Sequence, residues 1–472
     1  MYNPKSEHAD DFINHEEVME TLDYAEKNKH NKALIEEILE KARKDKGLSH
    51  REASVLLACD IPELNAQIFK LAKRMKEDFY GDRIVLFAPL YLSNYCVNGC
   101  VYCPYHARNK HICRRKLTQE EIKTEVMALQ DIGHKRLAIE CGEDPVNNPI
   151  EYILDSIHTI YNIKHKNGAI RRVNVNIAAT TIEEYRMLKK AQIGTYILFQ
   201  ETYHKENYGK LHPTGPKHNY DYHTESMDRA MIGGIDDVGC GVLFGLSTYK
   251  YEFAGLLMHA EHLEARFGVG PHTISVPRIR RADDIDPATF DNGISDDVFA
   301  KIVACIRVAV PYTGMIVSTR ESQKCREKVL ELGISQISGG SRTSVGGYAE
   351  EETEENNSKQ FDVSDRRSLD EVVSWLMKRD FVPSFCTACY RAGRVGDRFM
   401  SLCKSRQISN CCLPNALLTL KEYLCDYAQP DTKAIGLNVI NKQIANIGKE
   451  NVRNKVREEL ALIENGARDF RF

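Results

Sequence analysis

Short apolar runs alternate with amphipathic helical segments through the middle of this chain, and this alternation constrains the fold more than any other feature. The segments between the runs carry apolar residues at helical spacing, and several end in glycine, as helix C-termini often do. Repeated strand–helix units over roughly 260 residues predict an α/β protein with a closed (β/α)8 TIM-type barrel, and an open doubly wound sheet is the alternative. The eight predicted strands are residues 83–90, 135–141, 171–179, 194–201, 238–246, 272–279, 314–320 and 335–340.

The segments that flank the predicted barrel are mainly helical. Residues 12–80 have apolar residues at helical spacing, with Gly47 ending one helix and Ser49 placed to cap the next. Residues 350–360 form an acidic, polar run that predicts an exposed loop or linker. We therefore predict three parts: an N-terminal helical segment at 1–82, the barrel at 83–348, and a mainly helical C-terminal extension with a second cluster at 349–472.

The composition is that of an ordinary globular protein. Hydrophobic residues make up 42% and charged residues 28% of the chain, and no apolar run approaches the length of about 18 residues that a membrane helix needs. The formal net charge of −3 provides no general attraction to nucleic acid or to an anionic membrane. The acidic N-terminal stretch has neither a signal-peptide core nor the arginine-rich character of a transit peptide, so we expect a cytoplasmic location.

Cysteine usage points to metal binding. The chain has 15 cysteines, an odd number, and they cluster rather than spread. In a chain without a secretory signal this pattern disfavours a disulfide framework and favours metal ligation or catalysis.

The first cysteine cluster is the segment SNYCVNGCVYCPYH, which places Cys96, Cys100 and Cys103 in the spacing C-x3-C-x2-C. It directly follows the first predicted strand, at the mouth where barrels of this type place their active sites. Three thiolates on one short loop hold three irons of a cubane cluster and leave the fourth iron open. The alternative is a zinc site completed by His106, although structural zinc sites use four ligands in paired spacing.

This spacing, with the aromatic Tyr102 before the last cysteine, resembles the signature of the radical S-adenosylmethionine (SAM) superfamily, whose members use full or partial (β/α) barrels. The resemblance implies a [4Fe–4S] cluster that binds SAM and, with one electron, cleaves it to a 5′-deoxyadenosyl radical. Tyr102 is expected to contact this cofactor. Gly142 and Glu143 match the Gly-Gly-Glu motif that meets the methionine amino group, with Cys141 in place of the first glycine.

Three further polar residues on predicted strands are candidates for SAM binding. Strand alternation puts Asn174 and Asn176 on one face of the third strand, and Glu201 closes the fourth. The alternatives are that Asn174 is a polar plug inside the barrel and that Glu201 is an exposed loop carboxylate.

The second cysteine cluster lies in the C-terminal extension. Cys386, Cys389 and Cys412 have the spacing C-x2-C-x22-C, again with three thiolates. Spacing alone leaves open a zinc site in which Cys411 or Cys403 supplies a fourth ligand.

The second motif, together with YRAGRVGDRFM and segments such as RRVNVNIAATT and GVGPHTISVPR, makes nearly the whole chain resemble the HydG family of [FeFe]-hydrogenase maturases. The 2-iminoacetate synthases of thiamine synthesis resemble it in barrel and tyrosine cleavage but lack the C-terminal motif. The resemblance implies hydrogen abstraction from the tyrosine amino group and Cα–Cβ cleavage to p-cresol and dehydroglycine. Dehydroglycine then becomes carbon monoxide and cyanide at an auxiliary [4Fe–4S] cluster.

The same resemblance implies the ligands and partners of that second site. The auxiliary cluster carries an additional "dangler" iron with a free cysteine ligand, forming a [5Fe–5S] centre. The implied partners are L-tyrosine, free cysteine, an electron donor such as a ferredoxin or flavodoxin, and a hydrogenase maturation scaffold that receives the product. Among the two cysteines at 411 and 412, only the family spacing selects Cys412 as the third ligand.

Binding a tyrosine carboxylate requires a guanidinium fork, and Arg320 at the end of the seventh predicted strand is the leading candidate, with Ser318 on the same face. The alternative is that Arg320 forms a loop salt bridge with Glu321 or another acid.

The resemblance also implies that a histidine holds the dangler iron. His272 starts the sixth predicted strand and is therefore expected at the bottom of the barrel, where a C-terminal cluster domain would close the opening. His262 is the second choice. The alternative for both His259 and His262 is an ordinary histidine on a helix face, because both lie inside the preceding predicted helix. A neutral imidazole suits Fe(II).

Two other functions compete with tyrosine-dependent ligand synthesis. One is a radical SAM 2-iminoacetate synthase or a related lyase without carbon monoxide and cyanide production. The other is a non-catalytic iron–sulfur carrier, which the barrel and the open-iron triad disfavour because simple carriage needs neither.

Overall fold

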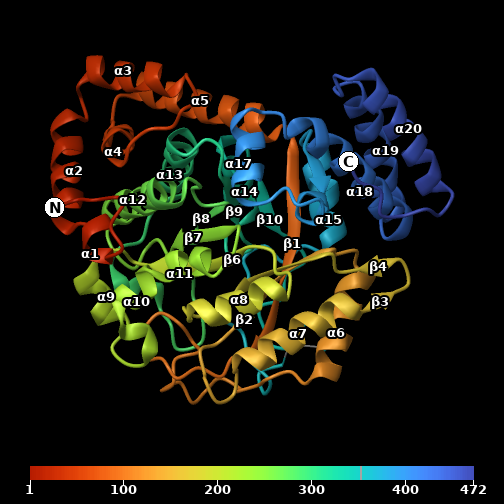
Figure 1. Ribbon diagram of the computed structural model, residues 1–472, viewed down its shortest axis with the longest axis horizontal. Helices are drawn as coiled ribbons and strands as arrows, with labels where there is room; N and C mark the ends of the chain where they lie inside the picture. Colours follow the sequence, from red (N-terminus) through yellow and green to blue (C-terminus); the bar gives the residue numbers. More distant parts are fainter. Residues whose placement is uncertain (351–352) are drawn as a thin grey trace.

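The structure is a computed structural model that describes residues 1–350 and 353–472, and its centre is a closed barrel of parallel strands (Figure 1). The barrel closes because β10 pairs with β1, with Gln336 opposite Val85. All eight predicted strands are present, so the predicted (β/α)8 fold is confirmed and the open sheet is excluded. The barrel strands are β1 (Arg83–Ser93), β2 (Arg136–Cys141), β5 (Arg172–Asn176), β6 (Tyr196–Glu201), β7 (Val238–Val242), β8 (Thr273–Ser275), β9 (Gly314–Val317) and β10 (Gln336–Ser338).

Three shorter strands lie outside the barrel order. β3 (Lys164–His165) and β4 (Gly168–Ala169) form a small antiparallel hairpin after α7. β11 (Val382–Ser384), which the sequence did not predict, pairs in parallel with the first residues of β1, where Val382 lies opposite Arg83. Because β11 joins the N-terminal end of β1, it brings the following cysteine segment to the bottom of the barrel.

Helices surround the barrel and begin at clear sequence signals. Thr118 with Glu121, and Thr181 with Glu184, form reciprocal capping boxes, and Gly268 ends α12 in the left-handed conformation at φ 72°. The surrounding helices are α6 (Gln119–Asp131), α7 (Ile150–Asn162), α8 (Ile182–Lys190), α9 (Lys205–Leu211), α10 (Tyr220–Thr224), α11 (Ser226–Ile232), α12 (Tyr249–Phe267), α13 (Asp296–Ala309) and α14 (Gln323–Leu332), with 3-10 turns η1 (Pro216–His218) and η2 (Pro287–Phe290).

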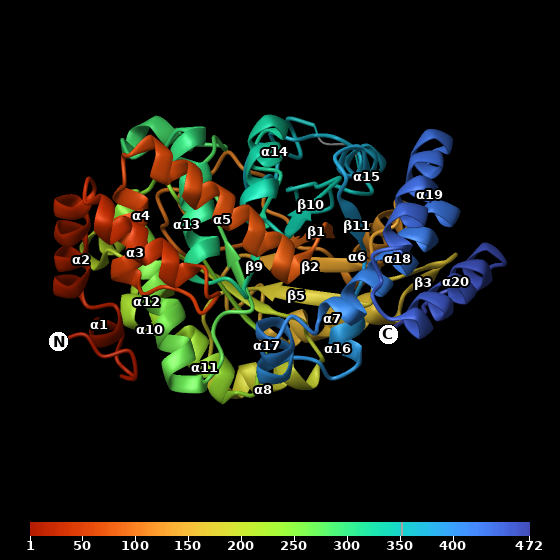
Figure 2. The same ribbon diagram turned by 90° about the horizontal axis from the view of Figure 1, so that it is seen from above.

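The N-terminal helices pack against α12 and α13 on one side of the barrel (Figures 1 and 2). Ser49 and Glu52 form the capping box of α4, as the sequence predicted. His50 lies 2.8 Å from both Glu17 and Glu261, and this buried contact ties α2, α4 and α12 together. The N-terminal helices are α1 (Ala9–Phe12), α2 (His15–Asn28), α3 (Lys32–Ala42), α4 (His50–Ala58) and α5 (Pro62–Tyr80).

The C-terminal helices α18–α20 lie on the side of the barrel opposite the N-terminal helices (Figures 1 and 2). A fully buried ion pair between Lys135 at the base of β2 and Glu422 of α18 joins this extension to the barrel. The C-terminal helices are α15 (Leu369–Lys378), α16 (Ala388–Arg391), α17 (Gly396–Lys404), α18 (Ser409–Asp426), α19 (Pro430–Ile444) and α20 (Glu450–Glu464). Within the described residues, no helix combines the length and apolar character needed to cross a membrane.

The acidic segment that follows the barrel differs from its prediction. The sequence predicted an exposed loop or linker at 350–360, of which 351–352 lie outside the described residues. Ser358 is instead buried, and Gln360 donates its backbone N–H to the Thr343 carbonyl at 3.1 Å. The prediction is therefore wrong for the part around Ser358 and Gln360, because backbone hydrogen bonds hold it against the loop after β10.

Candidate active site and second cysteine site

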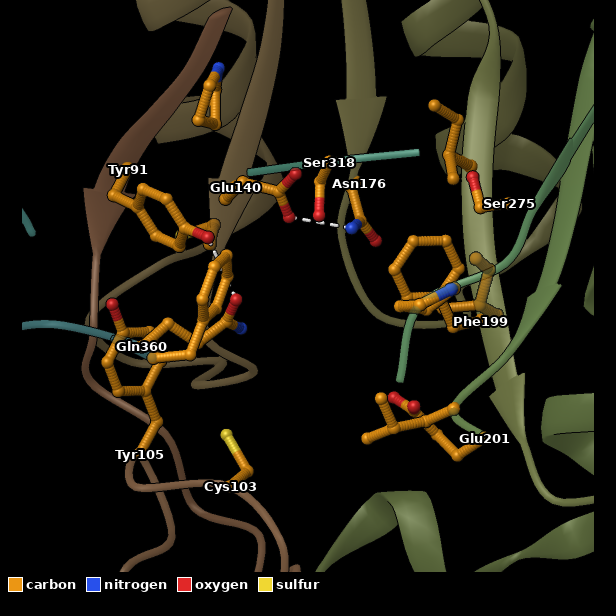
Figure 3. Close-up of a pocket in the computed structure, with 18 of the residues that line it drawn as sticks. Tyr91, Cys103, Tyr105, Glu140, Asn176, Phe199, Glu201, Ser275, Ser318 and Gln360 are labelled. Atoms are coloured by element: carbon orange, nitrogen blue, oxygen red, sulfur yellow. Dashed lines mark hydrogen bonds between the residues drawn. The ribbon is translucent and has the colours of Figure 1, made fainter. Parts of the chain in front are cut away.

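A deep cavity opens at the C-terminal ends of the barrel strands (Figure 3). Cys96, Cys100 and Cys103 line it together with side chains from seven of the strands. Its volume is about 220 Å³. We call it the barrel cavity.

The loop that carries the first three cysteines is held by Asn98. The amide of Asn98 donates to Glu143 Oε2 at 2.6 Å and accepts from the backbone N–H of Lys217 at 2.9 Å. Gly99 approaches Thr214 so closely that a Cβ atom would lie 2.2 Å from the threonine hydroxyl oxygen. The sequence NG between two cysteines therefore packs the loop against the chain after α9.

Gly142 and Glu143 lie beside that loop, as predicted for the cofactor motif. A Cβ atom at Gly142 would lie 2.3 Å from the Tyr95 carbonyl oxygen, so only glycine allows this approach to the cysteine loop. The Gly142 N–H donates to the Ser93 carbonyl at 3.0 Å. Burial raises the pKa of Glu143, and the hydrogen bond from Asn98 opposes this rise. Both residues line the barrel cavity.

The two asparagines of β5 occupy different levels of the barrel. Asn176 lines the barrel cavity and donates to Glu140 Oε2 at 2.6 Å (Figure 3). Asn174 does not line the cavity, and its Oδ1 atom accepts hydrogen bonds from Arg172 Nε and the Thr195 N–H, both at 3.0 Å. Asn174 therefore fits the alternative that the sequence left open, a polar plug inside the barrel. The strand face that it shares with Asn176 runs from the barrel cavity toward the bottom of the barrel.

Glu201 is buried at the end of β6 and lines the barrel cavity, so the alternative of an exposed carboxylate is wrong. Its backbone φ of 67° lies in the left-handed region, which is strained for a residue with a side chain, and β6 has an irregular register at this point. The Lys217 ammonium lies 3.0 Å from Glu201 Oε1. The strained backbone and this ion pair hold the carboxylate at the cavity wall (Figure 3).

Tyr102 also lines the barrel cavity, and its hydroxyl is anchored by His212. The Tyr102 oxygen lies 2.7 Å from His212 Nε2, and His212 Nδ1 lies 2.8 Å from the Tyr208 carbonyl oxygen. Burial lowers the pKa of His212 to about 2, so the imidazole is neutral. The neutral ring donates a hydrogen bond from Nδ1 to the Tyr208 carbonyl and accepts a hydrogen bond from the Tyr102 hydroxyl at Nε2.

Arg320 and Ser318 both line the barrel cavity, on the loop after β9. The predicted alternative of a salt bridge between Arg320 and Glu321 is wrong, because Glu321 pairs with Arg278 and Arg280 instead. The Arg320 guanidinium stacks on the Phe361 ring, 3.6 Å from its centroid, and it has no hydrogen bond or ion pair with any residue in the described ranges.

Several residues that line the cavity were not singled out from the sequence. Glu140 is the penultimate residue of β2, and burial raises the pKa of its carboxyl to about 8, while the nearby Arg320 charge opposes this rise. The Tyr91 hydroxyl donates to Gln360 Oε1 at 2.9 Å (Figure 3). Gln360 belongs to the segment 350–360 that was predicted to be an exposed linker, and Phe361 follows that segment directly. Glu140 had a usable signal, a carboxylate near a strand's C-terminal end, whereas Gln360 and Phe361 had none.

A second cavity lies at the opposite, N-terminal end of the barrel strands. Cys386, Cys389, Cys412 and His272 all line it, although they come from segments as far apart as residues 272 and 412. His272 lies immediately before β8, as the sequence predicted, and packs against Phe399 with ring centroids 4.7 Å apart. We call this space the basal cavity.

Four arginines surround the cysteines of the basal cavity: Arg83, Arg136, Arg172 and Arg394. The first three are the first residues of the adjacent strands β1, β2 and β5, a repeated signal that sequence analysis missed. A hydrogen bond with Cys412 and the nearby Arg394 guanidinium hold the pKa of Cys389 well below its usual value. The cavity therefore favours an anionic occupant such as a thiolate-bound metal cluster.

The alternative ligands for the cysteine sites are placed elsewhere. Cys411 and Cys403 do not line the basal cavity. His262 contacts Asp228 at 2.9 Å, and His259 contacts the Tyr203 hydroxyl at 2.9 Å, both within the α12 packing region. His106 lies 3.3 Å from Asp284 and does not line the barrel cavity.

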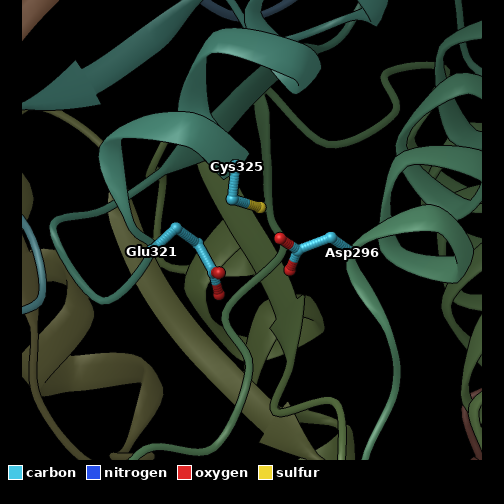
Figure 4. A group of neighbouring side chains, drawn as sticks. All are labelled: Asp296, Glu321 and Cys325. Carbon is cyan, nitrogen blue, oxygen red and sulfur yellow. The ribbon is translucent and has the colours of Figure 1, made fainter.

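One further group of possible metal ligands is Asp296, Glu321 and Cys325 (Figure 4). The Arg278 guanidinium contacts all three of them: Nη2 lies 2.7 Å from Asp296, 3.3 Å from Cys325 Sγ, and also pairs with Glu321. Because a cation already satisfies these groups, we interpret them as a structural ion-pair network that fixes the loop carrying Arg320.

Both cysteine sets fit iron–sulfur clusters. Each set consists of three free thiols that line one cavity. In the basal cavity, His272 Nδ1 lies 3.3 Å from the Asp237 carboxylate, and this contact orients the imidazole. An imidazole whose Nδ1 is held by a carboxylate is a suitable additional iron ligand through its other nitrogen.

Comparison with known proteins gives consistent matches. The Radical SAM superfamily model matches residues 90–257, and the model for the Biotin and Thiamin Synthesis associated domain matches residues 275–382. A crystal structure of HydG, a maturase of the [FeFe]-hydrogenase, is 55% identical, covers 98% of this chain and 100% of its own, and superposes with a TM-score of 0.94. HydG from Carboxydothermus hydrogenoformans is 39% identical over 96% of this chain and 99% of its own, with a TM-score of 0.82. The 2-iminoacetate synthase of Escherichia coli (strain K12) is 28% identical, covering 70% of this chain and 85% of its own.

Proposed function

Because the chain belongs to the HydG family of [FeFe]-hydrogenase maturases within the radical SAM superfamily, we propose that it cleaves the Cα–Cβ bond of L-tyrosine to p-cresol and dehydroglycine. We further propose that it converts dehydroglycine to carbon monoxide and cyanide, which become iron ligands of the hydrogenase active-site cluster. The observation that carries the proposal is the presence of two three-cysteine cavities at opposite ends of one barrel. A lyase without ligand synthesis needs only the first.

The barrel cavity is the proposed site of tyrosine cleavage. As a radical SAM protein the chain binds a [4Fe–4S] cluster and SAM, which together supply a 5′-deoxyadenosyl radical when bound. We propose that Cys96, Cys100 and Cys103 hold the cluster. The proposed SAM-binding residues are Tyr102, Gly142, Glu143, Asn176 and Glu201, all of which line the barrel cavity. Asn174 lies below this cavity, and we propose that it acts only by orienting Arg172.

Arg320 and Ser318 are the proposed tyrosine-binding residues. In the described part of the chain the Arg320 guanidinium has no ion-pair partner, so a substrate carboxylate would pair with it. Such an ion pair is more stable in a partly enclosed cavity than in water. Phe361 supports the flat face of the guanidinium, so its orientation is set before substrate arrives. Gln360 and Phe361 cover the cavity and exclude water from the reacting atoms.

The basal cavity is the proposed site of carbon monoxide and cyanide formation. We propose that Cys386, Cys389 and Cys412 hold an auxiliary [4Fe–4S] cluster and that His272 holds an additional iron with a free cysteine ligand, giving a [5Fe–5S] centre. The arginine wall supports this proposal, since it balances the negative charge of three thiolates and of cyanide.

This assignment divides the chain by function. We propose that residues 83–348 form the cleaving barrel, that 1–82 support it, and that 349–472 hold the second cluster. The segment from Asn357 to Asp365 is an exception, because it contributes to the barrel cavity rather than to the basal one. The proposed electron donor is a ferredoxin or flavodoxin, and the proposed recipient of the product is a hydrogenase maturation scaffold.

The test is anaerobic incubation of reconstituted protein with tyrosine, SAM and dithionite. We expect about eight irons per chain, four for each cubane, or about nine with the additional iron. We also expect p-cresol and carbon monoxide. Changing both Cys386 and Cys389 to Ser should leave p-cresol and abolish carbon monoxide, whereas Cys96→Ser should remove both. Absence of p-cresol from protein with an intact first cluster would exclude tyrosine as substrate. Production of p-cresol without carbon monoxide in the unmodified chain would support the 2-iminoacetate synthase alternative.

A further inference from the structure

The segment after α20, residues 468–472, lies against the C-terminal extension beside the second cysteine site, and the proposed reaction does not account for it. The mark C in Figures 1 and 2 shows that it returns to α18. Phe470 and Phe472 are half-buried and pack against the hydrophobic core. We call residues 468–472 the tail.

The tail runs along α18 in the direction opposite to that helix. Three contacts join successive tail residues to successively earlier turns of α18: Arg468 Nε to Asp426 Oδ2 at 2.8 Å, the Asp469 N–H to Glu422 Oε1 at 2.6 Å, and the Phe472 N–H to Asn415 Oδ1 at 2.9 Å. Asn415 is buried and lies three residues after Cys412. The tail therefore reaches the part of α18 that carries a cysteine of the basal cavity.

The same tail residues also hold the segment that follows Cys389. Arg391 donates two hydrogen bonds to the Asp469 carboxylate, at 2.8 and 2.7 Å. The Arg394 guanidinium donates to the main-chain oxygen of Phe472, and the Arg394 N–H donates to the Cys389 carbonyl at 2.8 Å. Arg394 also lines the basal cavity. The tail is thus a bridge between α18 and the segment 389–394.

Asp469 is the centre of this bridge. Its Oδ1 atom also lies 3.2 Å from Arg171, which immediately precedes β5. A carboxylate held by a bidentate guanidinium is among the stronger polar contacts in proteins. The backbone of Asp469 has a φ of 70°, in the left-handed region that aspartate and asparagine tolerate better than other residues with side chains. The surroundings of Asp469 therefore fix both its backbone and its carboxylate.

The cysteine segments need such support because neither is rigid by itself. Cys389 lies in α16, a helix of only four residues, and a single helical turn is unstable without outside contacts. Cys412 lies in the first turn of α18, where Pro414 removes one backbone donor. A metal centre requires its ligands at fixed separations, and surrounding hydrogen bonds commonly set them.

We propose that the tail is a clasp that positions Cys389 and Cys412 for the second cluster, with Asp469 as its main positioning residue. The proposal rests on the proposed function in one respect, namely that these thiols hold a cluster. The tail residues, all of which the structure describes, do not line the basal cavity. The tail therefore acts through Arg391 and Arg394 and touches no reacting atom.

The first experiment measures amide hydrogen exchange by mass spectrometry in full-length, cluster-free, reduced protein. Asp469→Asn removes the charge but keeps a side chain that tolerates a positive φ. Exchange in residues 388–394 should become about three- to tenfold faster, because the bidentate contact with Arg391 is lost. Exchange in residues 96–103 should not change.

Asp380→Asn is the matched control. Asp380 also has a positive φ, of 62°, and its carboxylate pairs with Lys442 at 2.6 Å in the same C-terminal extension. Neither residue lines the basal cavity or contacts the tail in the described structure. Exchange in residues 388–394 and the melting temperature should both match those of the unmodified protein.

The second experiment measures iron release from reconstituted protein to the chelator bathophenanthroline disulfonate. Cys96, Cys100 and Cys103 are changed to Ser in every sample, so that only the second site holds iron. Adding Asp469→Asn should speed iron release about three- to tenfold, and adding Asp380→Asn should not. With the first cysteines intact, Asp469→Asn should keep the rate of p-cresol formation and lower that of carbon monoxide formation.

Unchanged exchange in residues 388–394 of Asp469→Asn would overturn the inference. Equal acceleration in residues 96–103 would also overturn it, since the change would then be a general loss of stability. Unchanged iron release in Asp469→Asn would overturn the positioning role. If the unmodified chain binds only about four irons, the proposed second cluster is rejected, and the exchange result still decides whether the tail holds the two segments together.

Discussion

Replacement of Arg320 by Gln is the sharpest test of the tyrosine-binding site. The guanidinium lines the barrel cavity and is already oriented by the Phe361 ring at 3.6 Å. Truncating one partner of a hydrogen-bonded charge pair costs about 2–5 kcal/mol, and the partial exposure of Arg320 places the loss at about 2–3 kcal/mol. We therefore expect the KM for tyrosine to rise about 30- to 150-fold, measured as p-cresol formation by chromatography.

Two controls separate carboxylate binding from general damage. Tyramine lacks the carboxylate, so its inhibition constant should change by less than about threefold in Arg320→Gln. Arg320→Lys keeps the charge but loses the bidentate fork, and its KM should lie between those of the unmodified chain and the Gln variant. The melting temperature should not fall, because no described residue pairs with this guanidinium and burial already lowers its pKa.

An unchanged KM for tyrosine in Arg320→Gln, with the first cluster intact by its absorbance, would refute this reasoning. Equal weakening of tyrosine and tyramine would also refute it, since the loss would then come from the shape of the cavity rather than from the carboxylate. Arg280 lines the same cavity but pairs with Glu321, so a carboxylate-binding role would be sought there next.

Three other changes test the geometry. Gly142→Ala should abolish SAM cleavage, measured as 5′-deoxyadenosine, because the added Cβ would lie 2.3 Å from the Tyr95 carbonyl and displace the cysteine loop. Burial raises the pKa of Glu140 to about 8, so the folded state keeps a proton that the unfolded chain releases near pH 4.5. The contribution of Glu140 to the free energy of unfolding is therefore lost as pH rises from 4.5 to about 8. Glu140→Gln should show a smaller fall in melting temperature over this pH range than the unmodified protein. Lys135→Met should destabilise the fold by about 3 kcal/mol in urea unfolding, since it leaves buried Glu422 with weaker partners, and adding Glu422→Leu should restore most of the loss.

Local patterns in the sequence were sufficient for the eight barrel strands, for the helices between them and for the first cysteine site, but not for β3, β4 and β11. Strand and helix periodicities are set by neighbours within a few residues, and the capping boxes at Ser49 and Thr118 are wholly local. Cys96, Cys100 and Cys103 lie on one loop, so their convergence needed no knowledge of the rest of the fold. The barrel itself followed from the count and spacing of the units, and the closing pair of β1 and β10 confirmed it.

The division of 1–82, 83–348 and 349–472 stays a prediction, and so do the roles of the individual site residues. The sequence placed Asn174 and Asn176 on one face but could not tell that the cavity ends between them. It also predicted an exposed linker at 350–360, although Gln360 lines the barrel cavity, because its acidic and polar neighbours carry no sign of long-range hydrogen bonds.

The sequence by itself determined that three closely spaced thiols stand at the mouth of a (β/α)8 barrel. The sequence also led us to expect His272 at the bottom of the barrel, but only the tertiary structure placed Cys386, Cys389 and Cys412 in one cavity with it, inside a wall of arginines from three adjacent strands. The physical reason is that β11 pairs with the first residues of β1, a contact between segments about 300 residues apart that leaves no local pattern. The barrel's two ends thus became two separate sites.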